Sequence, residues 1–469
     1  MDTAVAGKLS VKPQIGFRAL VGIIFFTVSG GAYGLEVLVG TVGSFWALLL
    51  VLILPILWAL PIGLMVAELS SALPEDGGYY VWVKRALGPF WGFQEGWWTL
   101  CYSAANLAIF PVLFIGYLSF FFPHLGDAGM FGVRALISLS FVLLGLAFNL
   151  RGSGAVGTNA AANLLLVSFP FIAMTVWGLF EGSWGNLAAA LTPPAHIWIK
   201  PAELAAGLSI VLWNYSGWES VATCASDVEN PQRNFPRALG LSLVIITLSY
   251  VFPLLAGFKV TFNPADWGDT SGWPSIAERL GGRWLGYAGA ATALLSVWAL
   301  YNSLLLCVSH LPMVMARDGL LPKRLARTST TSGAPYTALI CLSVLTAGLS
   351  ALSLKKLIVV DILFYTLGLG LEFLALIALR EKEPNLTRPF RIKLPTWGLV
   401  LMSVPPIAIV VCVAVFSTLG EGSSLFQLGI VATGILAGTA VYFYKYRDPV
   451  PSTVLDPIRR TEHDPFAHV

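Results

Sequence analysis

Hydrophobic residues fill most of the chain in long runs, and short polar connections separate these runs. A helix that crosses a bilayer needs about 20 mostly apolar residues. Windows of that length predict twelve spanning helices, and therefore an all-α integral membrane protein. The windows cover residues 15–38, 43–70, 88–120, 131–149, 157–181, 203–226, 236–258, 283–316, 334–353, 358–380, 398–419 and 425–445.

Composition supports this interpretation. Of 469 residues, 56% are hydrophobic and 11% are charged, whereas a soluble domain carries about 25% charged residues. This argues against soluble, disordered, collagen-like and disulfide-rich secreted proteins, and we expect membrane lipid as a partner. A net charge of +3 gives no reason to expect a nucleic acid. The five cysteines are scattered, and no zinc-like spacing or C-x-x-C occurs, so we expect reduced cysteines and neither metal nor cofactor.

The distribution of Lys and Arg predicts the orientation. One set of connections, together with both tails, holds 21 of the 28 basic residues, and the other set holds 7. Basic residues accumulate in cytoplasmic loops. We therefore expect a multi-pass protein of the cell (plasma or inner) membrane with cytoplasmic tails at 1–14 and 446–469. The Trp-, Gly- and Pro-rich connections 181–201 and 261–283 are expected outside.

Two of the windows contain sequences that disfavour a continuous helix. The first contains S-G-G-A-Y-G-L-E at 29–36, and the sixth contains W-N-Y-S-G-W-E at 213–219. Glycine destabilises a helix by about 1 kcal/mol relative to alanine. Non-helical backbone persists in a bilayer only where protein or a water-filled cavity satisfies it. Close helix packing on small residues is the alternative for either cluster taken alone.

The two clusters occupy the same position in two five-helix halves. Interrupted first helices in two inverted repeats indicate a binding site near the membrane midplane of a secondary transporter. This predicts a first repeat at 15–181, a second, inverted repeat at 203–380, and two further helices at 398–445. Both clusters end in Gly-x-Glu.

Acidic and aromatic residues adjoin both clusters. Glu36 and Glu219 are each expected to cap a restarting half-helix, to carry a proton, or to balance a cationic substrate. Tyr33, Trp213, Tyr215 and Trp298 either pack or close over an ammonium group through cation–π contacts. Asn106 either lines the same cavity or hydrogen-bonds between helices.

Several motifs, taken in order, resemble the amino acid–polyamine–organocation (APC) superfamily, and most closely its polyamine:proton symporter branch, known from plant polyamine uptake transporters. The resemblance covers about residues 16–416. The matching segments are V-S-G-G-A-Y-G-L-E at 28–36, A-E-L at 67–69, P-E-D-G-G-Y at 74–79, G-P-F-W-G-F-Q at 88–94, E-N-P-Q at 229–232, F-P-R-A-L at 235–239, L-E-F at 371–373, R-P-F at 388–390 and Pro405-Pro406.

This resemblance implies a LeuT-like fold of ten helices in two inverted repeats with broken helices 1 and 6, plus helices 11 and 12. It also implies proton symport of an organic amine by alternating access. Glu219 would couple the proton, and Trp213 would act as a gate. The substrate-binding residues that we expect are Ser29, Gly30, Gly31, Ala32, Tyr33, Gly34, Glu36, Asn106, Trp213, Tyr215, Gly217 and Trp298.

Two alternatives remain open. Val37 stands where plant members tend to have Asp, which suggests a less acidic pocket and leaves room for a permease or exchanger of zwitterionic amino acids. Sodium is the alternative to the proton. We do not expect an enzyme, because the sequence has no G-x-S-x-G, H-E-x-x-H or phosphate-binding Gly-Lys-Ser/Thr element.

Overall fold

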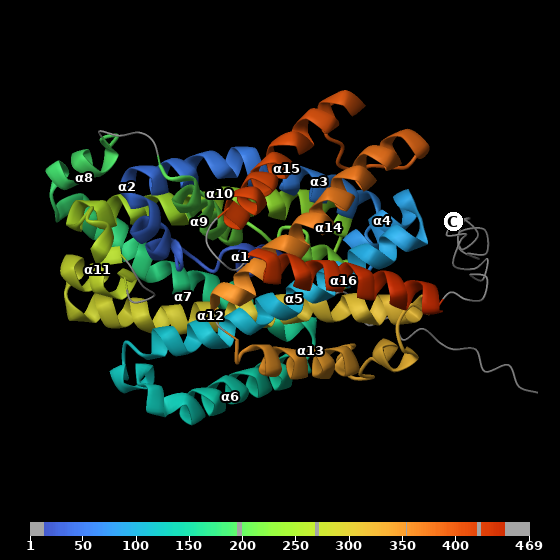
Figure 1. Cartoon of the computed structure of the whole chain (residues 1–469), viewed down its shortest axis with the longest axis horizontal. Helices are drawn as coiled ribbons and strands as arrows, with labels where there is room; N and C mark the ends of the chain where they lie inside the picture. Colours follow the sequence, from blue (N-terminus) through green and yellow to red (C-terminus); the bar gives the residue numbers. More distant parts are fainter. Residues whose placement is uncertain (1–13, 195–198, 268–271, 353, 420–423, 446–469) are drawn as a thin grey trace, which may run out of the picture.

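The computed structural model describes residues 14–194, 199–267, 272–352, 354–419 and 424–445, and most of them are helical (Figure 1). The prediction of an all-α chain is confirmed for these residues. The C-terminal tail at 446–469 and all of the N-terminal tail except Gln14 lie outside the described residues.

Long helices, including α5 and α12, run along the longest axis of the molecule (Figure 1). Within the described residues, eight helices are long and apolar enough to cross a membrane. These eight are the stretch Leu35–Ala72, α5 (Pro89–Leu118), α6 (Phe131–Asn149), α7 (Ser153–Phe180), α10 (Pro231–Val260), α12 (Arg283–Arg317), the part Leu363–Lys382 of α14 (Leu354–Lys382) and the part Thr396–Val413 of α15 (Thr396–Leu419). Helix α16 (Ser424–Lys445) is also long. The shorter helix α13 (Tyr336–Leu349) is also apolar.

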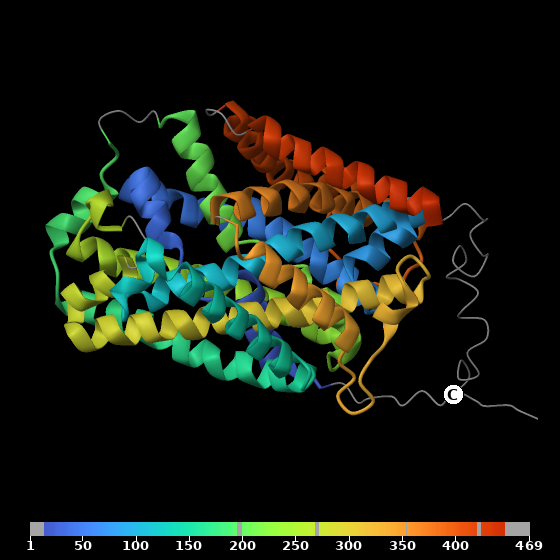
Figure 2. The same ribbon diagram turned by 60° about the horizontal axis from the view of Figure 1, so that its bottom comes forward.

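Burial separates central helices from peripheral ones. In the apolar stretch of α12, 72% of residues are buried, against 22% in α6. Leu136 and Leu144 of α6 are exposed, as is Phe180 at the end of α7. An apolar helix with an exposed apolar face is adapted to lipid, so α12 lies at the centre of the bundle and α6 at its edge. The helices α15 and α16 flank another side, as Figure 2 shows.

The connecting segments gather at the two ends of the bundle. The short helices α8 (Trp184–Leu191) and α11 (Gly272–Gly281) lie at one end, while α4 (Tyr79–Leu87) and the end of α16 lie at the other (Figure 1). The first pair belongs to the two connections predicted to be outside. In α11, Trp273 donates its indole N–H to the carbonyl of Ala32 at 2.7 Å, which joins this end to the first glycine cluster.

The first glycine cluster interrupts a helix. Helix α1 (Phe17–Val28) ends before the cluster, and α2 (Leu35–Leu54) begins after it. Helix α2 bends again at Gly43 and continues through a π-helical turn, η1 (Pro55–Ala59), into α3 (Leu60–Ala72). A Cβ atom at Gly30 would lie 2.5 Å from Leu300, and the φ of Gly30 is +67°, so glycine suits this position for two reasons.

The second cluster interrupts a helix in the same way. Helix α9 (Pro201–Asn214) ends, and after five residues the chain resumes as a 3₁₀ helix, η4 (Ser220–Asp227). Gly217 has a φ of +97°, and a Cβ atom there would overlap the carbonyl oxygen of Thr27. The second interruption therefore packs directly against the end of α1.

The beginning of α1 and the end of η4 are also joined. The N–H groups of Gln14 and Ile15 both donate to the carbonyl of Asp227 at 2.9 Å, and the N–H of Glu229 donates to Ile15 at 3.0 Å. Ile15 and Val228 form a parallel bridge. Backbone groups alone make this tie between the two interrupted segments.

Candidate functional site

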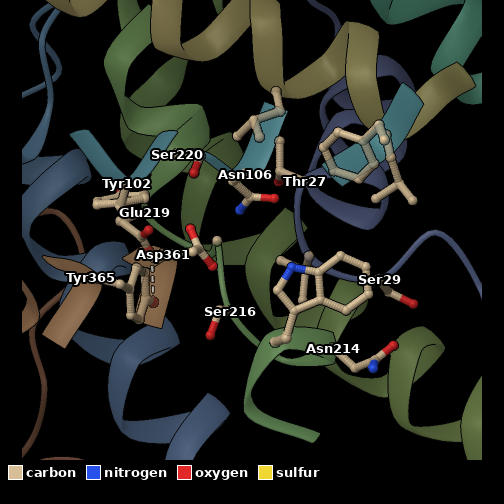
Figure 3. A pocket seen from close by; sticks show the side chains of 16 residues that line it. Thr27, Ser29, Tyr102, Asn106, Asn214, Ser216, Glu219, Ser220, Asp361 and Tyr365 are labelled. Carbon is tan, nitrogen blue, oxygen red and sulfur yellow. Dashed lines mark hydrogen bonds between the residues drawn. The ribbon is translucent and has the colours of Figure 1, made fainter. Parts of the chain in front are cut away.

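A small polar cavity of about 30 Å³ lies between the two interruptions. This volume admits a water molecule or one ammonium group. The polar side chains that line this inner cavity are Thr27, Ser29, Tyr102, Asn106, Asn214, Ser216, Glu219, Ser220, Asp361 and Tyr365 (Figure 3). They come from α1, α5, α9, α14, η4 and both interruptions, so helices from distant parts of the chain meet the two broken segments here.

Two carboxyl groups, those of Glu219 and Asp361, line the inner cavity. They lie on the same side of the cavity as Tyr365 (Figure 3). Glu219 is 0% exposed, and its Oε2 accepts a hydrogen bond from the Tyr365 hydroxyl at 3.2 Å. Asp361 is 5% exposed. No Lys or Arg is among the residues that line the cavity. Burying a carboxylate without a countercharge is costly, so the cavity favours a cation.

Unpartnered atoms sharpen this conclusion. Four buried side-chain atoms of the lining residues make no hydrogen bond within the described structure, and all four are oxygens. They are Asn106 Oδ1, Asn214 Oδ1, Glu219 Oε1 and Asp361 Oδ1. Carbonyl and ionised carboxylate oxygens only accept hydrogen bonds. The cavity therefore offers acceptors to a ligand that brings donors.

A second cavity of about 100 Å³ adjoins the first. Ser29, Trp213 and Leu300 line both cavities, so these side chains stand between them. The rest of this outer cavity is mainly apolar and is lined by Tyr33, Gly34, Val37, Ile109, Leu113, Tyr117, Ser209, Ile210 and Val297. It suits hydrocarbon rather than charge.

Glu36 lies apart from both cavities. Its side chain is 0% exposed, its Oε2 accepts from the N–H of Gly34 at 2.7 Å, and its Oε1 accepts from the hydroxyl of Tyr117 at 3.1 Å. Gly34 directly precedes α2, so this carboxylate satisfies a donor at the start of that helix. Of the roles considered for Glu36, the geometry favours the helix cap.

Some of the remaining residues of the first interruption line the cavities, and the others contact neighbouring helices. Ser29, Tyr33 and Gly34 line one or both cavities. Ala32 accepts from Trp273, and the carbonyl of Gly30 accepts from the Ser296 hydroxyl. Gly31 faces the side chains of α7 instead. Backbone groups in this segment are thus largely engaged by neighbouring helices.

The other expected site residues have different positions. Asn106, Trp213 and Gly217 line the inner cavity. Tyr215 is absent from the lining, and its hydroxyl donates to the carbonyl of Val51 at 3.2 Å. The ring of Trp298 packs on Phe141 at 5.6 Å and on Phe148 at 6.0 Å.

Asp361, Tyr102 and Tyr365 were not predicted from the sequence as site residues. A usable signal exists for Asp361, since an ionisable residue within an apolar spanning helix points to a functional site. It interrupts the run L-I-V-V-D-I-L-F in the tenth window. The same signal marks Glu95 and Glu372, which are also buried.

Comparison with known proteins agrees with this geometry. Residues 15–436 match the family model described as amino acid permease. The chain belongs to this family. It is 34% identical over 428 residues to the polyamine transporter PUT1 of Oryza sativa subsp. japonica, which covers 90% of this chain and 77% of that protein. It is 32% identical over 438 residues to the polyamine transporter RMV1 of Arabidopsis thaliana, covering 92% and 86%. The permease is thus a multi-pass membrane transporter and not an enzyme, as predicted.

Proposed function

We propose that this permease imports a polyamine or a related organic amine by proton symport with alternating access. The observation that carries this proposal is the set of four unpartnered acceptor oxygens in the inner cavity, two of them from carboxyl groups. An ammonium group supplies donors and positive charge together. The names of the similar plant proteins favour the same substrate class.

The transport architecture is part of the proposal. Twelve spanning helices would form a LeuT-like 5+5 inverted repeat, with repeats at 15–181 and 203–380 and two added helices at 398–445. The corresponding interruptions after α1 and α9 support it. The basic-residue asymmetry supports cytoplasmic termini and insertion in the cell membrane.

The two cavities suggest how an extended amine binds. One ammonium group occupies the inner cavity beside Asp361, and the methylene chain passes Trp213 into the apolar outer cavity. The indole contributes a cation–π contact worth about 0.5–2 kcal/mol. A linear amine with a charged end and a hydrocarbon chain matches this sequence of environments.

The two carboxyl groups of the inner cavity then have different roles. Asp361 remains ionised and balances the ammonium group, while Glu219 gains the coupling proton and later releases it. Glu219 belongs to the second interruption, which contacts the end of α1 through Gly217. A change in its charge therefore acts where the two broken segments meet.

A zwitterionic amino acid is the competing substrate. Its carboxylate would need free N–H donors at the start of a half-helix. At the first interruption, the N–H of Gly34 already donates to Glu36, and the N–H of Gly31 donates to the Ser29 hydroxyl at 3.1 Å. Because these N–H groups already have acceptors within the chain, the first interruption favours an amine over an amino acid as substrate.

Uptake by the purified full chain in proteoliposomes tests the proposal. Labelled putrescine, spermidine and neutral amino acids would be compared with an acidic exterior, with and without a proton ionophore and sodium. We expect amine accumulation that the ionophore abolishes and that sodium does not affect. Accumulation of amino acids alone, or a strict need for sodium, would overturn it.

A further inference from the structure

A second pair of carboxyl groups lies in the bundle, outside the cavities. Glu95 of α5 is 1% exposed and Glu372 of α14 is 3% exposed, and these two helices pack against each other. The Oε2 atoms of both make no hydrogen bond within the described structure. Glu95 Oε1 accepts from the Thr99 hydroxyl at 3.4 Å. No described Lys, Arg or His forms an ion pair with either carboxylate.

A buried phenol connects this pair to the inner cavity. Tyr79 is 0% exposed, and its hydroxyl has no hydrogen-bond partner among the described residues. The hydroxyl lies within electrostatic range of Glu219, Glu95 and Glu372. Tyr79 begins α4, at the end of the bundle opposite α8 and α11. The acidic groups thus lie between the inner cavity and that end.

The packing leaves no room for a larger ligand. A Cβ atom at Gly368 of α14 would lie 2.8 Å from Glu95 Oε1, so the carboxylate rests against the helix backbone. Neither Glu95 nor Glu372 lines any of the described cavities. No group of side chains in the described residues could hold a metal ion. A proton is the cation that fits.

Electrostatics requires that this proton be present. Several buried carboxylates without countercharges cannot all ionise, because each loses its hydration and repels the others. Glu219 interacts electrostatically with both Glu95 and Glu372. The other titratable groups that face one or more of these three carboxyls are neutral or acidic: Tyr79, Tyr102, Tyr365 and Asp361. The thiol of Cys307 faces Tyr79.

We propose that Glu95 and Glu372 form a second proton-binding site, through which the proton held by Glu219 leaves toward the α4 end. In this step, the O–H bond of the Glu219 carboxyl breaks and an O–H bond forms on the ionised member of the pair. The Tyr79 hydroxyl relays the proton by accepting one and donating its own, so that it ends unchanged. The net result is one proton moved and Glu219 restored as a carboxylate. This inference rests on the proposed proton symport.

Glu95→Gln and Glu372→Gln test the second site in reconstituted full-length protein. Each variant keeps the side-chain volume and removes the proton carrier. Gln94→Ala is the matched control, because Gln94 is the buried neighbour on α5 and points instead to Thr439 of α16, at 2.8 Å. Glu372→Asp keeps a carboxyl group at this position and should therefore keep proton coupling. The assays are spermidine counterflow, accumulation driven by an acidic exterior, and proton uptake measured with a pH-sensitive dye.

We expect both Gln variants to retain counterflow while their pH-driven accumulation falls at least fivefold, with the control unchanged. Accumulation and proton uptake equal to wild type in both Gln variants would overturn the inference. Loss of counterflow by folded Gln variants would also overturn it, since the pair would then belong to substrate binding. If one of the two Gln variants does not fold, the inference is tested with the other Gln variant and with Glu372→Asp. Absence of pH-driven accumulation in wild type would instead refute the proposed symport itself.

Discussion

Neutralising Glu68 should strongly destabilise the fold, because this carboxylate sits in a buried ion cluster. Its two oxygens accept from Arg380 Nε at 2.5 Å and Nη2 at 2.6 Å, and Oε2 also accepts from the N–H of Ile392 at 2.8 Å. Arg388 Nε lies 3.4 Å away. The Glu68 side chain is 1% exposed, and those of the two arginines are 5% and 6% exposed. The cluster joins α3, the end of α14 and the segment that leads to α15.

The magnitude follows from this burial. Glu68→Gln would leave two buried guanidinium groups without an anion. Burial already lowers the pKa of Arg388, although Glu68 opposes this effect. Removing one partner of a buried pair costs about 3–5 kcal/mol, which is about a 100- to 4,000-fold change in the folding equilibrium.

A more exposed pair at the same end of α14 provides the control. Arg85 and Glu383 form a bidentate pair at 2.8 and 2.7 Å, with side chains 25% and 29% exposed. This contact raises the pKa of Arg85. Glu383→Gln should cost about 1 kcal/mol or less, since solvent screens such pairs. Unfolding in mixed detergent micelles measures both variants. A loss for Glu68→Gln no greater than that for Glu383→Gln would refute the reasoning.

Four further predictions concern transport in proteoliposomes. Asp361→Asn should raise the apparent KM for spermidine at least tenfold, because a hydrogen bond to a charged group contributes about 1.5–3 kcal/mol; an unchanged KM would exclude its role as countercharge. Trp213→Ala should raise the same KM about 2- to 30-fold through loss of the cation–π contact, and a variant with wild-type KM would show that the indole only separates the cavities. Glu36→Gln should keep uptake within about threefold, since the amide oxygen can still accept from Gly34; loss of uptake in folded protein would contradict the cap role. Gly217→Ala should abolish uptake, because the added methyl group meets the carbonyl oxygen of Thr27, and normal uptake would show that the interruption tolerates displacement.

The helical fold and the interruptions were accessible from the sequence for simple physical reasons. Apolar runs long enough to cross a bilayer are rare in soluble proteins, and glycine clusters inside such runs mark where the helix cannot continue. Both properties are local. For this reason Ser29, Gly217 and Glu219 could be selected before their three-dimensional surroundings were known.

The partners of these residues depend on helix faces that a single sequence does not specify. Asp361 reaches the inner cavity because α14 packs on α5, more than 240 positions earlier in the chain. Glu36 is satisfied by Tyr117, 81 residues away. Trp298 resembles the other aromatic residues by type, yet its ring faces α6. Which neighbours a side chain faces depends on the rotation of each helix about its own axis, and the amino-acid composition of the helix does not determine this rotation.

The tie between the start of α1 and the end of η4 has a consequence for how such proteins diverge. Its hydrogen bonds join backbone groups of Gln14, Ile15, Asp227 and Glu229, and every amino acid except proline supplies the same N–H and C=O groups. The linkage itself therefore places no requirement on the side chains at these positions, apart from excluding proline where an N–H donates. In a comparison of related sequences, the mark that this tie leaves is an exclusion of proline at positions 14, 15 and 229, whose N–H groups donate.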